Sequence, residues 1–140
     1  MNSTTQKFSA GGVIYKDGKV LTIKWLSRNS IEFPKGTIEQ GEKSYETAIR
    51  EVSEETGYDV RILHPLGDIT FEFDWDDGKH YKKNVTYFLM ELANNNKPRP
   101  RREINEDFEN YWITIEEAER LLTHNDSLEI LKRVIVIIRP

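Results

Sequence analysis

The sequence predicts one α/β domain with a mixed sheet, and three observations support this. Segments typical of strands, joined by short turns, open the 140-residue chain and recur in its middle. Between them, residues 42–56 carry apolar side chains at helical spacing, and further apolar residues at that spacing follow near the end. A chain of this length buries roughly 68% of its unfolded surface on folding, which is enough for a single core.

The first strands are predicted at residues 8–15 and 20–26, where β-branched and other apolar residues dominate. Asp17 and Gly18 lie between them, and an Asp-Gly pair favours a tight hairpin turn. Residues 66–75 alternate well enough for another strand, and residues 83–92 are its expected partner or neighbour. We expect these strands to form a mixed sheet.

The first helix is predicted at residues 42–56. Its apolar residues form one stripe, made of Tyr45, Ala48, Ile49 and Val52. Gly57 follows where a left-handed C-terminal cap belongs.

Near the end of the chain, Thr114 and Glu117 form a capping box, which predicts the start of a second helix. Residues 127–138 fit two structures, since their apolar spacing suits a helix and their β-branched run suits a strand. We predict a helix.

Composition excludes several classes of function. With 37% hydrophobic and 31% charged residues the chain resembles an ordinary soluble protein, and without cysteine it has neither disulfides nor a thiolate metal site. We expect a cytoplasmic location and no membrane contact, because no secretory signal or apolar run of about 20 residues is present. The net charge of −4 disfavours a nucleic-acid partner, although residues 78–83 and 97–102 are basic segments that suit phosphates.

The helix at residues 42–56 concentrates acidic side chains. Glu51, Glu54 and Glu55 are three or four residues apart, so their carboxylates share one helix surface. A solvated acidic face is one interpretation. The alternative is a metal site, since a loop rich in Pro and Gly enters this helix and carboxylate oxygens suit Mg²⁺ or Mn²⁺ together with substrate phosphates.

The spacing of these residues resembles the signature of the Nudix hydrolase family. Gly36 is followed after five residues by Glu42, and after seven more by Arg50-Glu51-Val52-Ser53-Glu54-Glu55-Thr56-Gly57-Tyr58. The resemblance implies an α/β/α sandwich over residues 1–140. It also implies metal-dependent hydrolysis of a phosphoanhydride bond in a nucleoside diphosphate-linked substrate.

Roles for the site residues follow from the same resemblance. Glu51 and Glu55 would bind the metal, with the Gly36 carbonyl as another possible ligand. Glu54 would be the catalytic base or a further ligand. Arg50 would orient the carboxylates and Glu42 would brace the loop, although an ordinary ion pair and a helix-dipole contact would also explain these two. No nucleophilic triad is expected, because only three scattered histidines are present.

The substrate is suggested by residues outside the signature. Lys83 and Tyr87 resemble the Lys-x-x-x-Tyr-aromatic strand of the animal and archaeal diadenosine tetraphosphate hydrolases, which implies phosphate binding by Lys83 and base stacking by Tyr87. Lys35, beside Gly36, is a further substrate-binding candidate. Glu106, six residues before Trp112, matches an acidic metal ligand or base of that subgroup, although Glu103 and Glu109 compete for the role.

One departure leaves other substrates open. Many relatives have Trp where this chain has Ile31, so a stacking aromatic is missing there; Trp25, Phe71, Phe73 and Trp75 are possible replacements. We expect a small nucleotide or polyphosphate substrate, such as diadenosine tetraphosphate. An oxidised nucleoside triphosphate, a diphosphoinositol phosphate and a 5′-triphosphate RNA are alternatives, and so is a binding module without hydrolysis.

Overall fold

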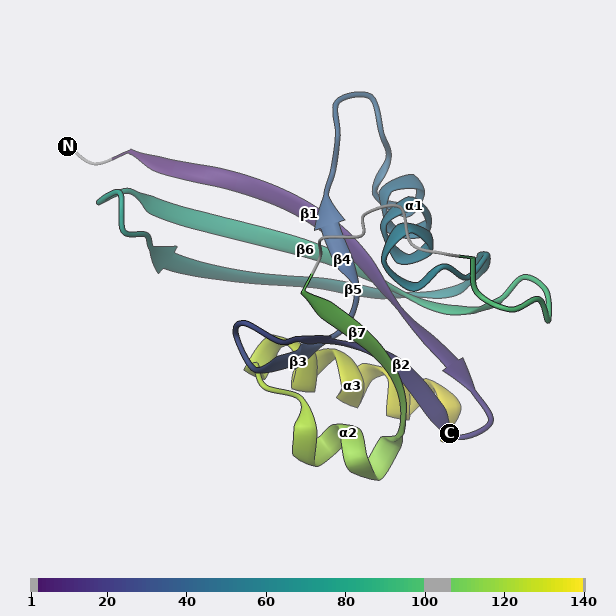
Figure 1. The fold of residues 1–140 in the computed structure, drawn as a ribbon. Coiled ribbons are helices and arrows are strands. Elements are labelled where there is room, and N and C mark those ends of the chain that lie inside the picture. The colour runs from purple at the N-terminus through teal and green to yellow at the C-terminus, as the bar shows by residue number, and fades with distance from the viewer. Residues whose placement is uncertain (1–2, 100–106, 140) are drawn as a thin grey trace.

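The computed structural model describes residues 3–99 and 107–139 (Figure 1). Its elements, in chain order, are β1 (Thr4–Lys16), β2 (Lys19–Trp25), β3 (Ser30–Glu32), β4 (Lys35–Thr37), α1 (Ser44–Thr56), β5 (Val60–Asp74), β6 (His80–Leu92), β7 (Phe108–Thr114), α2 (Ile115–Leu121) and α3 (Asn125–Ile138).

The strands form a sheet in the order β3-β2-β1-β6-β5, with β4 paired to β1 and β7 paired to β2. β1 joins the two parts, because residues 4–14 pair with β6 in parallel while Tyr15 and Lys16 pair with β2 antiparallel. β5 and β6 are antiparallel over nearly their whole length. The predicted mixed sheet is therefore confirmed.

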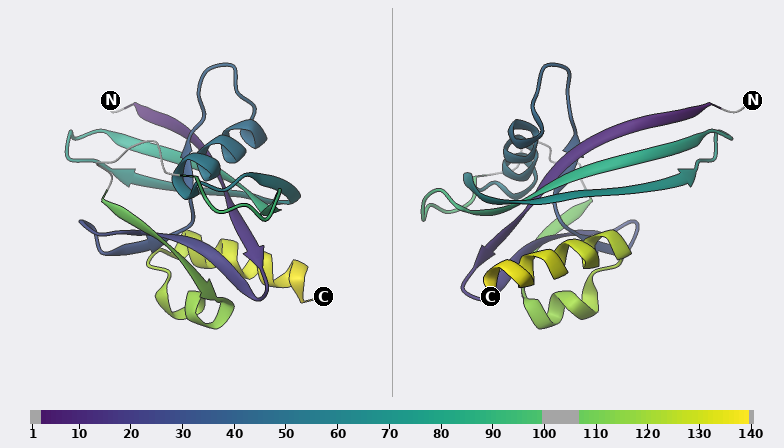
Figure 2. Two further views of the ribbon diagram at one scale, coloured as in Figure 1. Left: turned by 45° about the vertical axis from the view of Figure 1, so that its right-hand side comes forward. Right: turned by 180° about the vertical axis from the view of Figure 1, so that it is seen from behind.

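Helices cover both faces of the central strands, α1 on one side and α2 with α3 on the other (Figures 1 and 2). Alternate residues of β1 face the two layers: Ala10 and Ile14 pack with Ala48 and Val52 of α1, whereas Val13 belongs to the cluster that α2 and α3 complete. This arrangement is the expected α/β/α sandwich.

The predicted helices are present. α1 begins two residues later than expected, and Gly57 caps it with φ 79°. Thr114 Oγ1 accepts a hydrogen bond from Glu117 N, which starts α2 as predicted. The ambiguous segment is helical: α3 buries Ile130, Leu131 and Val134, so tertiary packing supports helix over strand.

The sequence did not predict β3 and β4, which are only three residues long each, or the seven-residue strand β7. It also placed the start of β5 too late. The strand begins at Val60, and register shifts on either side of Pro65 accommodate this residue within the strand.

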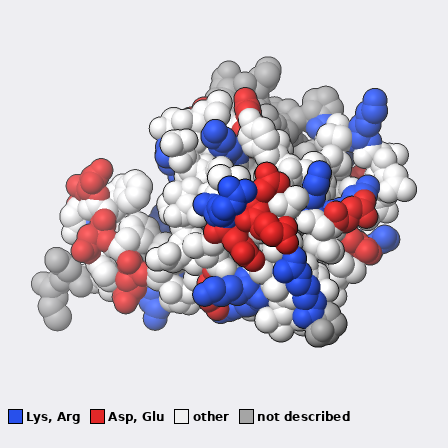
Figure 3. Space-filling model, turned by 90° about the horizontal axis from the view of Figure 1, so that it is seen from below, with Lys and Arg blue, Asp and Glu red and all other residues white. Residues whose placement is uncertain are grey.

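The N-terminal half of β1 and the distal ends of β5 and β6 extend beyond the helical layers as an arm (Figure 2). Seen from below, the arm carries mainly acidic groups, while acidic and basic groups alternate over the body of that face (Figure 3). No described helix is long and apolar enough to span a membrane.

Candidate functional site

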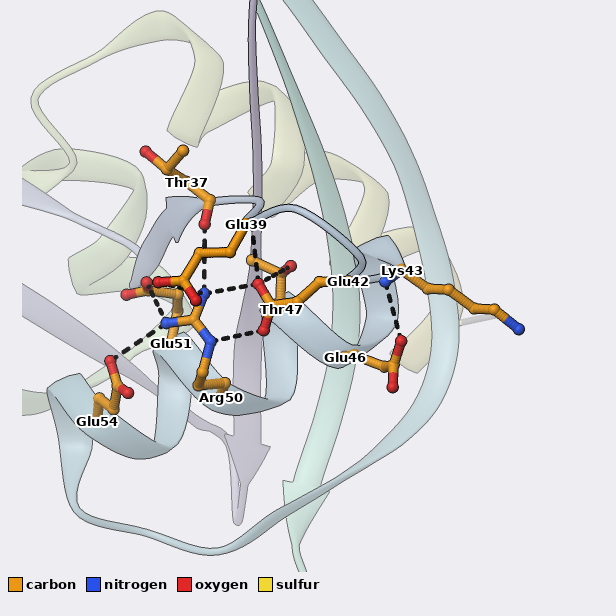
Figure 4. Close-up of polar contacts among 9 residues, drawn as sticks. All are labelled: Thr37, Glu39, Glu42, Lys43, Glu46, Thr47, Arg50, Glu51 and Glu54. Atoms are coloured by element: carbon orange, nitrogen blue, oxygen red, sulfur yellow. Dashed lines mark hydrogen bonds and ion pairs between the residues drawn. The ribbon is translucent and has the colours of Figure 1, made fainter.

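The loop before α1 and the exposed side of α1 meet at Arg50 (Figure 4). Its Nε donates to Glu42 Oε2 at 2.7 Å and its Nη2 to Glu42 Oε1 at 2.8 Å, a bidentate pair. Its Nη1 donates to Glu51 Oε1 at 2.8 Å and to Glu54 Oε2 at 3.4 Å. Three acidic residues of the signature thus share one guanidinium, and these ion pairs raise the pKa of Arg50.

Glu42 closes the loop onto the helix. Its Oε1 accepts hydrogen bonds from Glu39 N at 3.0 Å and from Thr47 Oγ1 at 2.9 Å, in addition to the bonds with Arg50. The bond with Arg50 is the main reason why the pKa of Glu42 falls to about 2, and the Glu39 amide contributes further. This geometry matches the bracing contact that the family resemblance implied.

Glu51 lies against the backbone of Gly36. A side-chain Cβ at position 36 would overlap the Glu51 carboxylate, so any residue other than glycine would require this carboxylate to move. Partial burial raises the pKa of Glu51 above its ordinary value, and the Arg50 guanidinium offsets part of that effect. A cation beside this carboxylate would favour its ionised form.

The oxygen donors around α1 suit a hard divalent cation, because Glu51, Glu54 and Glu55 are all half-buried on one helix and Gly36 contacts the first of them. Within residues 3–99 and 107–139, no three acidic or histidine side chains already enclose a common point. Arg50 lies between Glu51 and Glu54 instead. Binding a metal here therefore requires these carboxylates to turn oxygen atoms away from Arg50 or to share them.

A cleft of about 830 Å³ lies between the β5–β6 arm and the start of α3. It contains both lysines that the sequence proposed for substrate binding, Lys35 and Lys83. Partial burial, and then the Lys35 ammonium, lower the pKa of Lys83. Lys35 and Gly36 are neighbours on β4, so this strand contributes one residue to the cleft and the next to the contact with Glu51. Its lining residues are Arg28, Glu32, Lys35, Ile69, Phe71, Phe73, Trp75, Lys83, His124, Asn125, Asp126 and Glu129.

The stacking role expected of Tyr87 is contradicted by its position. Its side chain is 0% exposed and belongs to the core cluster with Val85 and Leu89, so it presents no ring face to a ligand. Burial is also the main cause of its raised pKa. The motif placed Tyr87 on the correct strand, but its ring points into the core between β6 and α3.

Sequence reasoning missed the carboxylate of Glu32 in this cleft. Its Oε1 accepts hydrogen bonds from Trp25 Nε1 at 3.1 Å and from Lys35 Nζ at 3.3 Å, and its Oε2 lies 3.6 Å from His124 Nε2. The contacts with Lys35 and Trp25 are local, three and seven residues away, whereas His124 is far along the chain, so no local pattern could indicate that contact. Trp25 does not itself line the cleft; its indole donates to Glu32, and the Arg28 guanidinium lies over its ring at 4.5 Å.

Other predicted residues lie elsewhere or cannot be placed. Glu103 and Glu106 fall outside the described residues, and Glu109 is exposed on β7, where its carboxylate accepts from the Tyr111 hydroxyl. Of the basic segments, 78–83 contributes Lys83 to the cleft. In the basic segment 97–102, Arg99 forms an ion pair with Asp59, with 2.9 Å between Arg99 Nη2 and Asp59 Oδ1.

Comparison with known proteins agrees with this geometry. The NUDIX domain matches residues 5–134. The chain belongs to the Nudix family. Among curated relatives, the ADP-ribose pyrophosphatase of Bacillus subtilis is 31% identical over 112 residues, which cover 76% of this chain and 57% of that protein. The RNA pyrophosphohydrolase of Hydrogenovibrio crunogenus is 25% identical over 120 residues, which cover 74% of this chain and 73% of that protein.

The same fold occurs in solved Nudix structures. The C. elegans Ap4A hydrolase in a binary complex superposes with a TM-score of 0.74 at 24% identity, covering 94% of this chain and 97% of that one. The E. coli dihydroneopterin triphosphate pyrophosphohydrolase gives a TM-score of 0.71 at 18% identity, and the match covers 96% of this chain and 99% of that one. The chain spans about half the length of several curated relatives that it matches.

Proposed function

We propose that this Nudix protein is a metal-dependent hydrolase of a phosphoanhydride bond in a nucleoside diphosphate-linked substrate. The observation that carries the proposal is the contact of Arg50 with Glu42, Glu51 and Glu54, which assembles the acidic residues of the signature on one side of α1. A bare acidic surface would need no such arrangement.

In this proposal Glu51 and Glu55 hold Mg²⁺ or Mn²⁺, with the Gly36 carbonyl as a further donor. The bound cation would neutralise phosphate oxygens and acidify a water molecule. Glu54 accepts the proton of the water that attacks phosphorus, while the anhydride P–O bond breaks and the leaving phosphate departs. Arg50 keeps the carboxylates in place, and Glu106 is a proposed additional base or metal ligand.

The proposed substrate class is a dinucleoside polyphosphate such as diadenosine tetraphosphate. Two lysines, Lys35 and Lys83, line a cleft beside the acidic site, and their ammonium groups suit several successive phosphates. The similarity to the C. elegans Ap4A hydrolase structure is consistent with this class. The relatives named for ADP-ribose and RNA define the competing substrates.

The proposal is tested by product analysis of the purified protein with Mg²⁺ and with chelator. The panel contains diadenosine tetraphosphate, nucleoside triphosphates, ADP-ribose, diphosphoinositol phosphates and 5′-triphosphate RNA. We expect metal-dependent cleavage of an anhydride bond, fastest with the dinucleoside polyphosphate. Cleavage of another substrate class alone would reject the proposed dinucleoside polyphosphate substrate. Binding of a substrate without any cleavage would reject the proposed hydrolase activity.

A further inference from the structure

Three aromatic residues follow one another along the wall of the 830 Å³ cleft. Phe71 and Phe73 are on the same face of β5 because residues two apart in a strand share a face, and Trp75 follows the strand end. Ring centroids of Phe71 and Phe73 are 6.1 Å apart, and those of Phe73 and Trp75 are 5.9 Å apart. The three rings form a continuous surface, here called the aromatic row.

The outer end of the aromatic row is exposed. The Trp75 side chain is 60% exposed, although the backbone around it is ordered by hydrogen bonds from Trp75 N to Lys79 O and from Gly78 N to Trp75 O. Phe73 is backed by Tyr81 of β6, whose ring stacks on it at 5.3 Å. Tyr81 therefore covers one face of the Phe73 ring, and most of Trp75 faces solvent.

The inner end of the aromatic row meets positive charge. Phe71 is paired with Lys83 across the β5–β6 ladder, and Lys35 lines the same cleft. Four residues of strand span about 13 Å, so Trp75 lies that far along β5 from the level of Lys83. A ligand that touches both must place several bonds between an anionic group and a flat apolar group.

A nucleoside polyphosphate has this shape. We propose that the aromatic row binds the nucleobase of a nucleotide whose phosphates are held by Lys83 and Lys35, with Phe73 and Trp75 as the stacking residues. The inference rests on the proposed function for the nature of the ligand. It assigns base recognition to β5 and the turn after it, in place of the buried Tyr87.

Binding without catalysis tests this assignment. With chelator present, the affinities of ATP, GTP and inorganic tripolyphosphate are measured by calorimetry for the wild type and for Phe73→Ala, Trp75→Ala and Trp75→Phe. The matched control is Phe8→Ala, since Phe8 is 51% exposed on the same arm. Phe8 pairs with Asn84, the neighbour of Lys83 on β6, so it lies on the face of the sheet opposite to Lys83 and the aromatic row. Thermal melts show whether each variant is folded.

Base–aromatic stacking contributes about 1–3 kcal/mol, so we expect Trp75→Ala to weaken the better-bound nucleotide about 5- to 150-fold and tripolyphosphate less than twofold. Trp75→Phe should recover part of the lost nucleotide affinity. Phe8→Ala should leave the affinities for both the nucleotide and tripolyphosphate unchanged. Equal weakening of nucleotide and tripolyphosphate, or unchanged nucleotide affinity in Trp75→Ala, overturns the inference. If the wild type cleaves nothing with Mg²⁺ but this pattern is found, the hydrolase proposal fails and the base site stands.

Discussion

The acidic site on α1 and the aromatic row on the arm differ in how the chain builds them. The acidic site is made within residues 36–55, and Arg50 and Gly36 make most of the contacts that join its carboxylates. The cleft that holds the aromatic row combines segments near residues 28–35, 69–83 and 124–129. The proposed catalytic residues on α1 thus come from one contiguous segment, whereas the proposed base site depends on how distant segments pack. Substitutions in the two regions should have different kinetic signatures.

The largest effect is expected at Glu54. Glu54→Gln removes the proposed proton acceptor but keeps the side-chain shape, so turnover should fall at least about 100-fold on every substrate that the wild type cleaves. Glu46→Gln is the control, since Glu46 is exposed on the same helix and its amide counterpart still accepts from Lys43 N. Retained turnover in Glu54→Gln would remove this residue from the mechanism.

The next largest effect should be on metal affinity. Glu51→Gln and Glu55→Gln each remove one negative charge from the proposed ligand set, and the Mg²⁺ concentration for half-maximal activity should rise at least about tenfold. Direct Mn²⁺ binding, measured by electron paramagnetic resonance, should weaken in parallel. A metal titration that neither variant changes would mean that the metal binds elsewhere.

A phosphate contact should give a smaller effect of another kind. Lys83→Ala removes a charged hydrogen-bond donor, so nucleotide and tripolyphosphate affinities should both fall about tenfold or more. Lys82→Ala is the matched control, because Lys82 is the exposed neighbour on the opposite face of β6. If Lys82→Ala has the same effect, the loss reflects general charge and not the cleft.

The smallest effect concerns stability and pH. The pKa of Glu42 is about 2 in the folded chain, below the ordinary value of about 4.3, so its ion pair stabilises the fold above pH 4.3. That contribution is lost as the pH falls from about 4.3 to 2. Glu42→Gln should lower the melting temperature slightly at pH 7, and the gap to the wild type should close near pH 2. A gap that is constant over this range would show that the ion pair does not cause it.

Sequence reasoning predicted which residues come together where their contacts are local in the chain. Gly36, Glu42, Arg50 and Glu51 could be grouped because their spacing resembles the family signature, and a loop and one helix bring them together. The hairpin at Asp17 and the cap at Gly57 are likewise local.

Sequence reasoning was insufficient where side-chain direction depends on the other layers. Tyr87 and Lys83 are on the same strand face, yet α3 covers Tyr87 while Lys83 lies beyond it in the cleft. The contact of Glu32 with His124 likewise requires β3 to meet the residue that precedes α3. Such placements follow from packing, which a pattern along one strand does not specify.

If catalysis belongs to α1 and base recognition to the arm, one kinetic comparison separates them directly. kcat/KM is measured for the best nucleotide substrate and for a pyrophosphate compound without a base, using the wild type, Glu54→Gln and Trp75→Ala. We expect Glu54→Gln to lower both kcat/KM values by the same factor and Trp75→Ala to lower only the nucleotide value. Equal losses in Trp75→Ala, or a loss confined to one substrate in Glu54→Gln, would contradict this expectation.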